Sequence, residues 1–203
     1  AMNTGLPFLA VQIAGIILFQ TDNLIIAQIL GAREVTPYSV TWRLFSYSSL
    51  LQMISMPALW PAYSDAFARR DFAWIRKTYR YNVAFSLGST FAFVGVLLMV
   101  ARPFIALWAG PAAVPSYGLV IAMAIWNPLA ALSACESCLL GASGRVKGQA
   151  IYSGIGAVVN IAASVFLGRR FGLIGIVGGT ICAYAVCIIV PQSIEVQRRL
   201  SGK

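Results

Sequence analysis

Residues 82–101 read NVAFSLGSTFAFVGVLLMVA, twenty residues without one charged side chain. A run of this length is sufficient to cross the hydrocarbon core of a bilayer as an α-helix. Similar runs recur along the chain with short breaks; 59% of its 203 residues are hydrophobic and only 10% are charged. The sequence therefore predicts an all-α fold, a polytopic membrane helix bundle with no room for a sizeable soluble domain.

We expect six membrane-spanning segments, all within a single lobe that covers residues 1–203. The breaks between them carry unequal positive charge, with ten Lys and Arg residues on one side and four on the other. The positive-inside rule places the side with ten in the cytoplasm, together with both termini. The expected spans are residues 6–30, 37–63, 82–101, 117–140, 149–167 and 171–194.

Residues 66–80 predict a basic amphipathic helix between the second and third spans. Apolar side chains recur at helical spacing from Ala68 to Tyr79, and basic side chains occupy the opposite side. Such a helix is suited to the anionic cytoplasmic surface of the membrane. The alternative is an ordinary solvated connector. The basic residues are Arg69, Arg70, Arg76, Lys77 and Arg80.

Three charged residues, Asp22, Arg43 and Glu136, lie well inside the apolar segments. A charge at the centre of a membrane helix costs roughly 2.5–3.5 kcal/mol even on lenient insertion scales, so it usually faces a bundle interior or a wet cavity. Two interpretations follow. The charged residues line a transport path, or they form a structural ion pair that holds two helices together.

Polar residues accompany these charges on the first two spans. Gln12 and Asn23 are three helical turns apart and nearly eclipse each other, with Asp22 beside them; Arg43 and Tyr47 share a face of the second span. Because sequential spans usually neighbour each other, Asp22 and Arg43 are candidates to meet. Without a partner, Arg43 is a fixed cation matched to a phosphate or diphosphate group.

Glu136 lies within a run of small residues on the fourth span, where a carboxylate can bind a cation or a proton. Catalysis and metal binding by histidine are excluded because the chain contains none. The four cysteines lie within apolar segments and are expected to pack there, so we expect no metal site and no cofactor. The net charge of +9 is concentrated in the loops beside the spans, which argues for membrane topology and against a nucleic-acid partner.

Small residues mark where helices are expected to approach each other closely. Gly175 and Gly179 form a G-x-x-x-G pair at the start of the sixth span. Such a pair lets two backbones pack together without intervening side chains.

Several stretches, taken in order, resemble one family. Residues 22–31 read DNLIIAQILG and are followed by Tyr38-Ser39-Val40, a segment with Pro57 and Pro61, and the basic helix. Near the end, Val159-Asn160-Ile161 and a short basic link precede residues 171–175, which read FGLIG. This order is similar to that of the polysaccharide and O-antigen flippases of the multidrug/oligosaccharidyl-lipid/polysaccharide exporter superfamily, over nearly the whole chain.

The resemblance implies one six-helix lobe, the C-terminal one, of a two-lobe transporter in the bacterial inner membrane. Its partners would be the lipid bilayer, an undecaprenyl-diphosphate-linked sugar, and a second lobe or a second copy of the chain. The lobes would rock by alternating access, without enzymatic activity, while Asp22 and Arg43 line the central cavity. The alternatives are a multidrug extruder of the same superfamily, a non-transporting scaffold, or a membrane transferase in which Asp65 and Asp71 are the nearest approach to paired acids.

Overall fold

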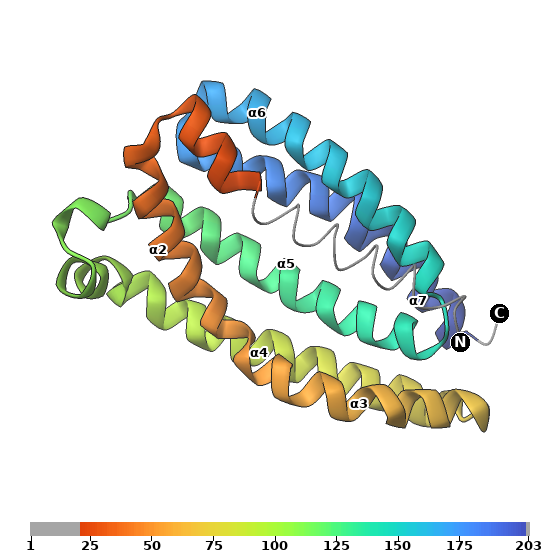
Figure 1. Cartoon of the computed structure of the whole chain (residues 1–203). Coiled ribbons are helices and arrows are strands. Elements are labelled where there is room, and N and C mark those ends of the chain that lie inside the picture. Colours follow the sequence, from red (N-terminus) through yellow and green to blue (C-terminus); the bar gives the residue numbers. More distant parts are fainter. Residues whose placement is uncertain (1–20, 202–203) are drawn as a thin grey trace.

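The computed structural model describes residues 21–201, and in this part of the chain every regular element is a helix and no strand forms (Figure 1). The expectation of an all-α fold is confirmed for these residues. Three of the helices are long and apolar enough to cross a membrane, which agrees with a membrane protein. They are Phe72–Trp108, Tyr117–Ala142 and Val146–Leu200.

The described chain begins with a helix over residues 21–29, and Leu30 and Gly31 connect it to the next element. α5 lies in the middle of the bundle and contacts α2, α3, α4, α6 and α7 (Figure 1). The elements after the first helix are η1 (Ala32–Glu34), α2 (Val35–Ser46), η2 (Tyr47–Ser49), α3 (Leu50–Ala68), α4 (Phe72–Trp108), η3 (Pro111–Ala113), α5 (Tyr117–Ala142), α6 (Val146–Tyr184), the π-helical η4 (Ala185–Ile189) and α7 (Val190–Leu200).

α6 folds back on itself at Gly172. This residue has φ 62° and ψ −142°, a conformation that breaks the helix and that L side chains rarely adopt. The two arms of α6 then run side by side. A methyl group on Gly179 would lie 2.6 Å from the amide nitrogen of Ser164, and one on Gly175 would meet the carbonyl of Leu167. The close helix packing predicted from the G-x-x-x-G pair is therefore confirmed.

Residues 66–80 do not form one helix of their own, and this prediction is wrong. α3 ends at Ala68, and Arg70 adopts φ 59° in the turn that follows. Asp71 then caps a new helix by accepting a hydrogen bond from the Trp74 amide at 3.0 Å, and α4 continues without interruption to Trp108. The left-handed residue and the cap divide the segment, so its basic residues are shared between a turn and the first turns of α4.

The surface of the bundle is rich in large apolar side chains. Met99 and Leu107 on α4 are 83% and 89% exposed, and Val158 on α6 is 70% exposed. Soluble proteins seldom expose many such side chains together, because each exposed apolar surface in water costs free energy. This surface indicates that lipid surrounds the bundle.

The helices connect at two opposite ends. The turns 69–71 and 143–145 lie at one end with the C-terminal part of α7, where Tyr63, Ile75, Leu139 and Val196 form one buried cluster (Figure 1). We call this the basic end. Its basic residues are Arg69, Arg70, Arg76, Lys77, Arg80, Arg145, Lys147, Arg198 and Arg199.

Candidate functional site

Asp22 is completely buried between three helical elements. Its Oδ2 atom accepts a hydrogen bond from the Tyr38 hydroxyl of α2 at 2.9 Å and another from the Thr180 hydroxyl, in the second arm of α6, at 3.1 Å. Within residues 21–201, its Oδ1 atom has no hydrogen-bond partner. A buried carboxylate lowers stability unless hydrogen bonds or an opposite charge compensate it. Among the described residues, only one of the two Asp22 carboxylate oxygens has such hydrogen bonds.

Asn160, in the first arm of α6, completes what we call the Asp22 network: Asp22, Tyr38, Asn160 and Thr180. The Asn160 amide donates to Thr180 Oγ1 at 2.9 Å, and its Oδ1 atom is buried without a hydrogen-bond partner in the part of the chain that the structure describes. The close approach of the two arms at Gly179 brings Asn160 and Thr180 within hydrogen-bond distance. The network therefore holds two oxygen atoms with unused acceptor capacity, an arrangement suited to a proton or a hard cation.

Asn23 is half-buried and joins the first helix to α2. Its Oδ1 atom accepts a hydrogen bond from the Ser39 hydroxyl at 3.2 Å. This contact connects two adjacent helices, as amide side chains in membrane helices commonly do. Gln12, the other amide predicted on this face, lies outside the described residues.

Arg43 and Asp22 do not meet. Arg43 is exposed, and among residues 21–201 it makes no ion pair with any acid, since the pairs found there are Arg69–Asp65 and Arg145–Glu195. Tyr47, one helical turn further on, is 43% exposed. Of the two arrangements left open by the sequence, residues 21–201 show the one in which Arg43 is exposed and not paired with Asp22.

Glu136 is buried in α5, and no basic residue lies close to it in the sequence. Its Oε1 atom accepts a hydrogen bond from the Ser193 hydroxyl of α7, and its Oε2 atom has no hydrogen-bond partner among the described residues. Beside it, the hydroxyls of Ser133 and Ser137 lie 3.3 and 3.5 Å from Gln192 Oε1. These polar contacts join α5 to α7 next to the π-helix η4, a helical irregularity that is frequent at functional sites.

The sequence did not single out Thr180, Gln192 and Ser193 as site residues. Each is an ordinary polar residue within an apolar segment, and its importance comes from partners far away in the chain. The one available signal was the position of Thr180 directly after Gly179, because a residue beside a close helix contact faces the neighbouring helix.

Comparisons with models of protein families, with curated proteins and with solved structures found no match.

Proposed function

We propose that this chain is one lobe of a membrane transporter that flips a lipid-linked oligosaccharide by alternating access. The observation that carries a transport function is the Asp22 network. It places a carboxylate inside an apolar bundle and leaves Asp22 Oδ1 and Asn160 Oδ1 without a hydrogen-bond partner among the described residues. Ionisable groups at such positions are by default functional, as ion sites or parts of a substrate path.

A purely structural role explains these groups less well. Buried polar atoms in native proteins are nearly always hydrogen-bonded, and each exception asks for a reason. If the network served only to hold helices together, additional hydrogen-bond donors to Asp22 Oδ1 and Asn160 Oδ1 would make it more stable. A coupling site needs the opposite, because those atoms must be available to a proton or a cation in one state of the transport cycle.

Six membrane crossings are part of this proposal. The first helix, α2 with α3, α4 and α5 give four, and the two arms of the helix that bends at Gly172 give two more. The positive-inside rule then places the basic end in the cytoplasm, with both termini there and the bundle in a bacterial inner membrane.

The substrate class follows from Arg43 and Tyr47. A guanidinium on an exposed face of α2 offers a fixed positive charge to a diphosphate group, and a neighbouring tyrosine offers a ring on which a sugar can stack. Because α2 carries Arg43 and no acidic residue, this face favours an anionic lipid head group over a cationic drug. A second lobe or a second copy of the chain would close the cavity over it.

Liposomes that contain the purified chain and an undecaprenyl-diphosphate-linked sugar test this function. We expect translocation of the lipid, and we expect Asp22→Asn and Arg43→Gln each to reduce its rate at least about tenfold, the effect of about 1.4 kcal/mol. Asp65→Asn and Arg169→Gln are the matched controls, since both residues are exposed and lie outside the proposed path. Equal rates in all four variants would contradict the proposed path. Absence of translocation by the unmodified chain would contradict transport by two copies of this chain, and would make a separate second lobe a requirement of the proposal.

A further inference from the structure

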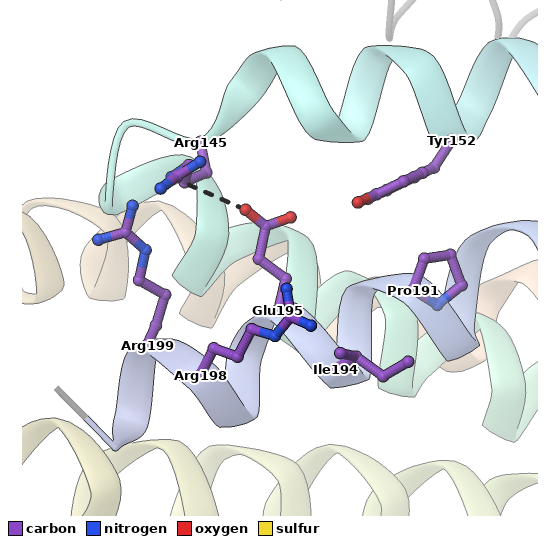
Figure 2. A pocket seen from close by; sticks show the side chains of 7 residues that line it. All are labelled: Arg145, Tyr152, Pro191, Ile194, Glu195, Arg198 and Arg199. Atoms are coloured by element: carbon purple, nitrogen blue, oxygen red, sulfur yellow. Dashed lines mark ion pairs between the residues drawn. The ribbon is translucent and has the colours of Figure 1, made fainter. Parts of the chain in front are cut away.

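A hollow of about 530 Å³ opens at the basic end, between the start of α6 and α7 (Figure 2). It lies apart from Arg43 and from the Asp22 network, and nothing in the proposed transport step uses it. The side chains that matter for its chemistry are those of Arg145, Tyr152, Ile194, Glu195, Arg198 and Arg199.

The hollow exists because the last helix changes its packing partner. η4 packs closely on α6, where a methyl group on Gly156 would lie 3.0 Å from the Ile188 side chain. After η4, α7 packs against α5 instead. The start of α6 and α7 therefore leave a space between them, which opens toward the surface of the bundle.

The hollow carries a surplus of positive charge. Three arginines surround one carboxylate, that of Glu195, which pairs with Arg145 over 3.8 Å (Figure 2). Within the described chain, Arg198 and Arg199 make no ion pair. The local net charge is therefore positive, and two guanidinium groups remain available to an anion. Planar guanidinium groups bind phosphate oxygens through paired hydrogen bonds.

An exposed apolar surface leads away from these charges. Ile194 lines the hollow and is 47% exposed, and Val190, one helical turn before it, is 53% exposed. On α6, Ile151 and Ile155 are 61% and 53% exposed. A ligand that matches both the positive charge of the hollow and this apolar surface has a phosphate at one end and a hydrocarbon chain at the other.

We infer that this hollow is a head-group site for an anionic glycerophospholipid. Arg198 and Arg199 hold the phosphate, Arg145 adds charge from the start of α6, and the acyl chains lie along Val190 and Ile194. The surplus of positive charge selects an anionic lipid over a zwitterionic one. A bound lipid here would hold α6 and α7 together at the end where their direct packing stops.

Native mass spectrometry of the full chain in detergent tests this site with three probes. They are phosphatidylglycerol, phosphatidylcholine with the same acyl chains, and sn-glycerol 1-phosphate. We expect phosphatidylglycerol to bind about tenfold more tightly than either other probe. Arg198→Gln and Arg199→Gln should each weaken its binding about tenfold, as the loss of one charge-assisted hydrogen bond predicts.

Lys147→Gln is the matched control, because Lys147 is an exposed cation in the first turn of α6 that does not line the hollow. This variant should leave phosphatidylglycerol binding unchanged. In the absence of lipid, all variants should unfold at the same temperature as the unmodified chain.

Glu195→Gln should instead strengthen phosphatidylglycerol binding about fivefold, because it frees Arg145 and removes the local negative charge. Equal losses in the Lys147 and Arg198 variants would show diffuse charge attraction and overturn the site. Equal binding of sn-glycerol 1-phosphate would show that it accepts a soluble phosphate ester, which would overturn the lipid assignment.

Discussion

A single methyl group on Gly179 is expected to destabilise the bundle measurably. In Gly179→Ala the new methyl would lie 2.6 Å from the Ser164 amide nitrogen, whereas ordinary contacts begin at 3.4 Å, so the two arms of α6 must separate by about 0.8 Å. Forced overpacking of this kind costs about 1–3 kcal/mol. The obstacle is backbone, which cannot move aside as a flexible side chain can.

The separation also lengthens a contact that depends on it. The Asn160–Thr180 hydrogen bond, at 2.9 Å, joins the two arms and would be stretched. Hydrogen bonds between membrane helices contribute about 0.6 kcal/mol each. With the overpacking cost, the total destabilisation is about 2–4 kcal/mol, equivalent to a fall in melting temperature on the order of 5–10 °C.

Thermal unfolding in detergent, followed by circular dichroism, measures this effect. Gly178→Ala is the matched control, because a methyl group at Gly178 meets nothing within 4 Å. Both variants gain the same intrinsic helix propensity, up to about 1 kcal/mol, so the difference between them isolates the clash. Equal melting temperatures for the two variants would refute the close packing of the arms and, with it, the geometry of the Asp22 network.

Three further predictions follow from other contacts. Tyr38→Phe removes the hydroxyl that donates to Asp22 and should lower the free energy of unfolding by about 1–3 kcal/mol in the same assay, while Tyr81→Phe, at a side chain that is 67% exposed, should not. Glu136→Gln preserves side-chain volume and removes the charge, so it should retain substrate binding and reduce only the dependence of transport on an ion gradient; a fully coupled variant would make Glu136 a packing residue. A single cysteine at the exposed position Ala73, in a cysteine-free background, should react with a membrane-impermeant reagent only from the cytoplasmic side, and periplasmic labelling would contradict the proposed topology.

The general architecture was accessible from the sequence because it depends on local properties. Apolar runs of helical length predict helices wherever they occur, and a G-x-x-x-G pair predicts a close contact whatever the partner. The error at residues 66–80 has an equally local cause. The apolar stripe runs through Arg70 without any sign that this non-glycine residue adopts a left-handed conformation, so the periodicity gave no warning of the turn.

The contacts of Asp22 were less predictable, because the sequence suggests only which helices are neighbours. Chain order made α2 a natural partner, and α2 does supply one donor, from Tyr38. The expected partner Arg43 instead lies on an exposed face of the same helix, five residues from Tyr38 and therefore well over one turn away. The second donor, Thr180, is 158 residues from Asp22 along the chain, a separation that no pattern of spacing could connect.

These contacts also indicate which part of the bundle can move as a unit. The two arms of α6 are locked together by backbone contacts at Gly175 and Gly179, so they are expected to behave as one rigid body. Residues 21–29 of the first helix contain no glycine, and there Asp22 reaches Thr180 through a side-chain hydrogen bond. Breaking one side-chain hydrogen bond costs less free energy than separating two packed backbones.

If Asp22 gains a proton or a cation, the bond to Thr180 is the interaction that changes first. The first helix can then shift with α2 while the α6 hairpin keeps its shape. Under the proposed transport function, such a hinge between a rigid hairpin and a side-chain-linked helix would link the binding of one ion to a movement between helices.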